Sequence, residues 1–90
     1  MEKKSFRVTN EIGIHAKTAT MLVNLTMKFD CDINLTALKK TVDFKSIMGV
    51  MSLGIYSGTD IVITCDGDDE KEAIEAIKAK IIELGIGKEI

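Results

Sequence analysis

The sequence contains no tryptophan and no proline, and aromatic residues make up only 4% of its 90 residues. Hydrophobic residues as a whole still account for 46% of the chain, a share typical of a globular protein and far from a disordered composition. With so few aromatic side chains, the core must be built from Ile, Leu, Val, Met and Ala. A chain of this length is expected to form one domain with a small core.

The sequence also lacks an excess of basic residues and any long hydrophobic run. Its 12 Lys and Arg residues are outnumbered by 14 Asp and Glu residues, which argues against a nucleic-acid-binding surface. No apolar run approaches the roughly 20 residues that a membrane-spanning helix needs. Because the first residues also lack the apolar region of a signal peptide, we expect a cytoplasmic protein.

Cysteine and histidine are scarce, with two Cys residues and one His residue. Cys31 and Cys65 both fall in predicted strands, where a single disulfide is possible but two small buried hydrophobes in a reducing compartment are the favoured interpretation. No Cys/His spacing suggests zinc. The acidic run 66–72 lacks the alternating ligands and the distant Glu of a calcium loop. We therefore expect neither a metal nor a cofactor.

Hydrophobic periodicity predicts seven elements in the order β-α-β-β-α-β-α. Alternating or β-rich runs predict strands at residues 4–9, 31–36, 41–44 and 61–65. Helical spacing predicts one helix from Ala16 to about residue 27 or 28, a short one that stops near Gly54, and a third that ends at Gly85. This order favours an α+β fold with a four-stranded, mainly antiparallel sheet and the helices on one face.

Three local features complete the predicted fold. The turn at residues 37–40 contains no Gly, Asn or Pro, so its type cannot be predicted. Asp69 and Glu72 resemble a capping box at the start of the third helix, with Asp in the Ser/Thr place. Residues 87–90 are expected to form a tail.

His15, the only histidine, lies between a glycine and a predicted helix. Gly13 is free to take a backbone conformation that is closed to other residues. A neutral imidazole is a good nucleophile toward a phosphoryl group, and the free N–H groups of Ala16 and Lys17 at the helix start can bind the anion produced. The helix dipole and the Lys17 ammonium add positive charge.

These residues alone leave two interpretations of His15 open, a phosphoryl acceptor or an ordinary surface histidine. A lone histidine without a Ser, Cys or carboxylate partner at a recognisable spacing does not make a hydrolase.

Ser46 directly precedes an apolar run, which is an N-cap signal. A phosphate on this serine would face the helix N–H groups, with Lys45 adjacent. Most N-cap serines are only caps, and the residues alone favour that interpretation.

The apolar run after Ser46 is too short to bury every side of a helix. We expect Val50 to face the core and Met51 to face outward, together with Ile47 or Met48. Exposed methionines suit a surface that docks several partners.

Two segments resemble the HPr family, the histidine-containing phosphocarrier proteins of the bacterial phosphoenolpyruvate-dependent sugar phosphotransferase system. They are Gly13-Ile-His-Ala16 and the ten-residue run Lys45-Ser-Ile-Met-Gly-Val-Met-Ser-Leu-Gly54. The second resembles the regulatory-serine signature of HPr from Gram-positive bacteria. The resemblance extends over the whole chain in element order and length.

The resemblance implies an open-faced β-sandwich with strand order 1-4-2-3 and three helices on one face. It implies that His15 accepts a phosphoryl group from enzyme I and passes it to sugar-specific IIA components, with Lys17 stabilising the phosphate charge. Such a protein is a covalent carrier rather than a turnover enzyme on its own. Ser46 would be phosphorylated by HPr kinase/phosphorylase, and the seryl-phosphorylated form would bind a catabolite control regulator of transcription.

Partners of the family dock around the first two helices. Here that surface would comprise Thr20, Ile47, Met48, Met51 and Leu53.

The chain departs from the family after the histidine, where Lys17 and Thr18 replace the usual Arg and Pro. Lysine keeps the charge but loses the planar fork that grips phosphate, and Thr18 lacks the fixed φ that suits a first helical turn. We expect transfer through His15 to persist but to be slower than in a typical member. The alternative is a regulatory paralogue that acts mainly through Ser46. Such paralogues lack the histidine, which this chain keeps.

Overall fold

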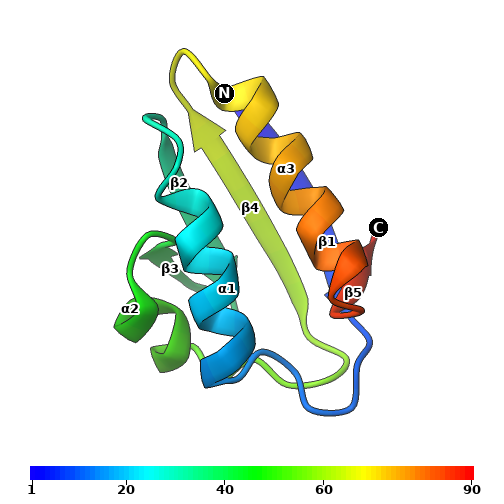
Figure 1. The fold of residues 1–90 in the computed structure, drawn as a ribbon. Coiled ribbons are helices and arrows are strands. Elements are labelled where there is room, and N and C mark those ends of the chain that lie inside the picture. The colour runs from blue at the N-terminus through cyan, green and yellow to red at the C-terminus, as the bar shows by residue number, and fades with distance from the viewer.

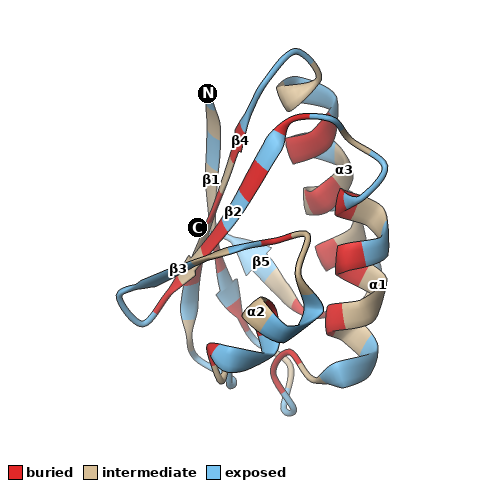
Figure 2. Cartoon of the chain, turned by 90° about the vertical axis from the view of Figure 1, so that its left-hand side faces the viewer, coloured by how far each residue is buried: buried red, intermediate tan, exposed pale blue.

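Five antiparallel strands form one sheet, and three helices cover one of its faces (Figures 1 and 2). The computed structural model describes all residues, 1–90. The elements in chain order are β1 (Glu2–Val8), α1 (Ala16–Thr26), β2 (Asp32–Ala37), β3 (Lys40–Asp43), α2 (Ile47–Ser52), β4 (Asp60–Asp66), α3 (Glu70–Glu83) and β5 (Gly87–Glu89). No helix is both long enough and apolar enough to span a membrane.

The sheet has the order β3-β2-β4-β1-β5, with every neighbouring pair antiparallel. It contains the predicted order 1-4-2-3, so the predicted α+β open-faced sandwich is confirmed. The predicted tail is instead a fifth strand, in which Gly87 pairs with Val8. A Cβ atom on Gly87 would lie only 2.2 Å from the carbonyl oxygen of Arg7, so this close approach requires a glycine.

The core lies between the sheet and the helices, where the buried faces of α1 and α3 turn toward the strands (Figure 2). The central strand β4 buries Ile61, Ile63 and Cys65, and α3 buries the predicted apolar stripe that includes Ile74 and Ile77. This arrangement follows from period-two side-chain alternation in the strand and 3.6-residue periodicity in the helix.

The two cysteines are free and buried, as expected for small core residues. Burial raises the pKa of the Cys31 thiol to about 12 and that of Cys65 to about 11. Because the thiolate is the reactive form, both thiols are poor nucleophiles near neutral pH.

The turn at residues 37–40, whose type could not be predicted, joins β2 and β3. Only two residues lie between the strands, because Ala37 pairs with Lys40. Leu38 and Lys39 both adopt positive φ, at 52° and 68°. These are the values of a type I′ hairpin turn, which normally favours Asn and Gly. The turn is therefore imposed by the pairing of the strands and carries no local sequence signal.

The predicted capping box at the start of α3 is wrong. Asp69 occupies the N-cap position but makes no side-chain bond to its own helix. Its carboxylate instead accepts hydrogen bonds from the backbone N–H groups of Asp30, at 2.8 Å, and Cys31, at 2.9 Å. Asp69 therefore ties the start of α3 to the segment before β2, a tertiary contact that the local pattern does not reveal.

Candidate functional site

His15 is the N-cap residue of α1, as its position before the helical pattern predicts. Its backbone is extended, with φ −114° and ψ −174°, and its carbonyl oxygen accepts from Ala19 N–H at 2.8 Å. The residue is only partly buried. The imidazole is therefore open to an incoming group and is not sealed in the core.

The His15 ring faces the first turn of α1. Its Nδ1 atom accepts a hydrogen bond from the backbone N–H of Lys17 at 3.3 Å, which places the lone pair of Nδ1 toward the free donors of the helix. The first turn contains no acidic residue, and the exposed Lys17 side chain makes no ion pair. A dianion attached to Nδ1 would therefore meet backbone donors, the helix dipole and an unpaired ammonium.

Thr18 holds the backbone of His15 through two hydrogen bonds. The Thr18 hydroxyl accepts from His15 N–H at 3.1 Å and donates to the His15 carbonyl at 3.2 Å. From the sequence, Thr18 was expected only as a replacement for proline, and these bonds were not predicted. Thr18 stands at N3, the position whose side chain bonds back to the N-cap amide in a capping box, and a polar side chain at that spacing was the available signal.

The loop before His15 is held by Asn10 and by the segment after α2. Gly13 has φ +79°, which confirms its predicted special conformation, and a Cβ atom there would lie 2.2 Å from the Ile55 carbonyl oxygen. Asn10 donates to the Gly13 carbonyl at 2.9 Å and accepts from its N–H at 3.0 Å. Ile14 N–H donates to the same Ile55 oxygen at 3.0 Å. Sequence analysis missed Asn10, although an Asn shortly before a Gly is a turn signal.

Ser46 caps α2 as predicted, because its Oγ atom accepts from Gly49 N–H at 3.0 Å. Lys45 does not extend over this hydroxyl. Its Nζ atom donates to the carbonyl oxygen of Phe29 at 2.7 Å, beyond the end of α1. The expected support of a Ser46 phosphate by the neighbouring ammonium is therefore not pre-formed.

A second contact ties the segment before α2 to α1. The hydroxyl of Thr26, the only buried polar residue, shares its proton between two carbonyl oxygens, that of Val23 in its own helix at 2.9 Å and that of Phe44 at 3.0 Å. The serine-bearing turn is thus fixed against the C-terminal end of the helix whose N-terminal end carries His15.

The two predicted sites lie on neighbouring helices. Helix α2 packs beside α1 at the end where α1 begins, in both views (Figures 1 and 2). His15, Ala16, Lys17 and Thr20 occupy the first turns of α1, and Thr20 is half-buried with its hydroxyl bonded to the Ala16 carbonyl at 2.8 Å.

The predicted outward face of α2 is largely present. Met48 is 84% exposed, Ile47 and Met51 are also exposed, and Val50 faces the core. Leu53 was expected on this face, but it is buried, with only 5% of its surface exposed. Leu53 lies at the C-cap of α2, where the chain turns back toward the sheet, so its side chain contributes to the core rather than to a docking surface.

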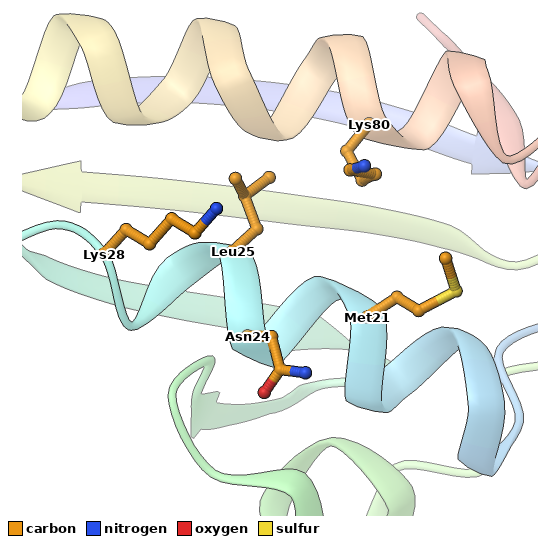
Figure 3. A pocket seen from close by; sticks show the side chains of 5 residues that line it. All are labelled: Met21, Asn24, Leu25, Lys28 and Lys80. Atoms are coloured by element: carbon orange, nitrogen blue, oxygen red, sulfur yellow. The ribbon is translucent and has the colours of Figure 1, made fainter.

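A cavity of about 260 Å³ lies between α1 and α3, away from this end of the helix pair (Figure 3). Its lining residues are Met21, Asn24, Leu25, Lys28 and Lys80. None of the predicted site residues lines it. The candidate site is therefore an exposed helix start and not a ligand pocket.

Comparison with known proteins identifies the family. A family model described as the phosphorylation site of the HPr component of the phosphotransferase system matches residues 2–83. The histidine-containing phosphocarrier protein of Mycoplasma is 38% identical and superposes with a TM-score of 0.93, covering 96% of this chain and 98% of that one.

Two further similar structures come from Bacillus. Phosphocarrier protein HPr from Bacillus anthracis is 40% identical, with a TM-score of 0.81 over 88% of this chain and 94% of that one. The catabolite repression protein Crh of Bacillus subtilis is 36% identical, with a TM-score of 0.72 over 86% of this chain and 88% of that one. The match over nearly the whole length, together with the shared sheet and helices, shows that this chain belongs to the HPr family of the phosphotransferase system.

Proposed function

We propose that this protein is a phosphocarrier that accepts a phosphoryl group on Nδ1 of His15 from the phosphohistidine of enzyme I and passes it to sugar-specific IIA components. The observation that carries the proposal is the contact between His15 Nδ1 and the Lys17 amide at the start of α1. A ring nitrogen that accepts an N–H bond keeps its lone pair, and the other nitrogen then carries the proton.

The transfer can proceed without a separate acid or base. The Nδ1 lone pair attacks phosphorus, a new N–P bond forms at His15, and the N–P bond of the donor histidine breaks. The donor imidazole leaves with the electron pair of that bond, so each ring keeps the proton on its other nitrogen. The contribution of this protein is to position the ring and to stabilise charge, through the Lys17 amide and ammonium.

Ser46 is the proposed regulatory site. Phosphorylation there by HPr kinase/phosphorylase would place two negative charges beside the exposed residues Ile47 and Met48 and so change how partners dock. With Met51 and Thr20, these residues form the proposed docking surface for enzyme I, the IIA components, the kinase and a catabolite control regulator. All of these encounters are proposed to take place in the cytoplasm.

A second candidate function is that of a regulatory paralogue acting mainly through Ser46. The similarity to Crh supports it, because that protein is 36% identical over most of its length. Retention of His15 at an accessible N-cap favours the carrier.

The test uses phosphoenolpyruvate, enzyme I and the full-length protein. The carrier proposal predicts a phosphate that is labile in acid, stable in base and absent from His15→Ala. In parallel, HPr kinase and ATP should give an acid-stable phosphate that is absent from Ser46→Ala. If only the second label forms, the paralogue is correct and the carrier proposal is wrong.

The replacement of arginine by Lys17 provides a graded test. Lys17→Arg should raise the rate of phosphoryl acceptance, because a guanidinium can bind two phosphate oxygens at once. Lys17→Met should lower the rate, since it keeps the length of the side chain and removes its charge. Equal rates in all three proteins would show that this charge plays no part in transfer.

A further inference from the structure

Thr18 makes the only side-chain hydrogen bonds to the backbone of His15. Histidine is not among the preferred N-cap residues, which are Ser, Thr, Asn and Asp. The bond from the Lys17 amide to Nδ1, at 3.3 Å, is also a long one. The ring contact by itself is therefore a weak hold on the helix start, and the Thr18 hydroxyl supplies a second one.

The two contacts differ in what happens to them during transfer. Once phosphorus is bonded to Nδ1, that nitrogen has no lone pair left to accept from the Lys17 amide, which is then free for a phosphate oxygen. The Thr18 hydroxyl contacts only the backbone of His15, so both of its bonds can persist before, during and after the reaction.

We propose that Thr18 is a positioning residue for phosphoryl transfer, whose hydroxyl fixes the His15 backbone so that Nδ1 remains aimed at the Lys17 amide. This inference rests on the proposed carrier function. Thr18 stands where the family usually has proline. A proline would fix the start of the helix by restricting φ, whereas the Thr18 hydroxyl fixes it by hydrogen bonds to the N-cap.

The alternative is that Thr18 only stabilises α1, as any capping residue does. A structural role predicts loss of stability and no change in transfer while the protein is folded. A positioning role predicts a change in the orientation of the His15 ring and in the chemical step. The two roles can be separated because another hydroxyl of α1, on Thr26, supports the fold at the far end of the helix.

The experiment compares wild type with Thr18→Val, Thr18→Ser and Thr26→Val, at a temperature where urea titration shows all four to be folded. Valine has the shape of threonine without the hydroxyl, and serine keeps the hydroxyl. Initial rates of phosphoryl transfer from phosphorylated enzyme I give kcat and KM. Nitrogen-15 NMR of the imidazole reports the tautomer and hydrogen bond of Nδ1, and hydrogen exchange reports the His15 amide.

We expect Thr18→Val to lower kcat about tenfold with KM unchanged, the scale of effect expected when a reacting group is slightly misplaced. The same variant should shift the Nδ1 resonance and speed exchange of the His15 amide. Thr18→Ser should restore kcat and the resonance, and Thr26→Val should match wild type in both.

The inference is overturned if Thr18→Val and Thr26→Val have the same kcat and the same Nδ1 resonance. It is also overturned if Thr18→Val acts only through KM, or if serine does not restore kcat. Should wild type accept no phosphoryl group at all, the carrier function fails, and the NMR comparison alone then decides whether Thr18 orients His15.

Discussion

The buried hydroxyl of Thr26 offers the sharpest test of how α1 is joined to the turn that carries Ser46. Thr26 is fully buried, and its hydroxyl is the only side-chain donor to the carbonyl oxygen of Phe44, at 3.0 Å. The single proton of this hydroxyl is shared with the carbonyl oxygen of Val23, which lies 2.9 Å away in the same helix. Replacing Thr26 by valine keeps the shape of the side chain but leaves that buried carbonyl without a partner. We therefore expect Thr26→Val to destabilise the fold.

The magnitude follows from two opposing terms. An unsatisfied buried acceptor costs about 1–3 kcal/mol. Replacing the hydroxyl by a methyl group returns up to about 0.8 kcal/mol of apolar burial. The expected net loss is about 1 kcal/mol, within a range of about 0.2–2 kcal/mol, and 1 kcal/mol corresponds to a fall in Tm of about 4–8 °C for a domain of this size.

The assay is urea unfolding followed by circular dichroism, where a lower midpoint with an unchanged m value reports a loss of stability. Thr20→Val is the matched control, since it makes the same substitution in the same helix. Its hydroxyl donates to the Ala16 carbonyl at 2.8 Å, but this bond is exposed, so water can replace it. The control should stay within about 0.5 kcal/mol of wild type. If Thr26→Val is as stable as wild type, or if both variants lose the same stability, the reasoning about the buried carbonyl is wrong.

Three further predictions concern the caps and the loop around the site. Ser46→Ala should lower stability by about 1 kcal/mol in urea unfolding, because it removes the bond to the α2 backbone, whereas Ser46→Asp should retain most of that stability; equal losses would argue against a capping role. Gly13→Ala should lower both Tm and the rate of phosphoryl acceptance, because Gly13 has φ +79° and a Cβ atom there would clash with the Ile55 carbonyl oxygen. An unchanged rate would show that the conformation of this loop does not affect transfer. The backbone N–H of Asp30 is the main group that holds the pKa of the Asp69 carboxyl below its ordinary value. The stabilisation that the ionised Asp69 carboxylate contributes should be complete above its unfolded-state pKa of about 3.9. It should be lost as pH falls through the lower folded-state pKa. The stability difference between wild type and Asp69→Asn should accordingly shrink below about pH 4 in a pH series of urea titrations, and a constant difference would contradict this assignment.

The elements that could be predicted from the sequence are those whose signal is local. The apolar stripe of α3 repeats at the helical period, the continuous β-rich run at residues 61–65 became β4, and the serine ahead of α2 is a local N-cap signal. The position of His15 as an N-cap followed for the same reason, since the helical pattern begins at the next residue.

The features that could not be predicted depend on segments far apart in the chain. Local spacing suggested that Asp69 caps its own helix, but the backbone of Asp30 and Cys31 lies closer to its carboxylate. Leu53 was expected on the exposed docking face, but the chain turns back toward the sheet after α2 and buries its side chain in the core. The short β5 strand has no hydrophobic pattern of its own, and forms because Gly87 fits closely against β1.

The sequence by itself therefore determined the class of fold, the two residues proposed for phosphorylation and the family, because local periodicity and a ten-residue signature carry that information. Only the tertiary structure decided how His15 is held. The contact of Nδ1 with the Lys17 amide, the two bonds of the Thr18 hydroxyl and the engagement of Lys45 by Phe29 are matters of side-chain direction. The Lys45 contact joins segments that lie far apart in the chain, and the bonds at His15 depend on the way the ring and the hydroxyl turn, which the order of residue types does not fix.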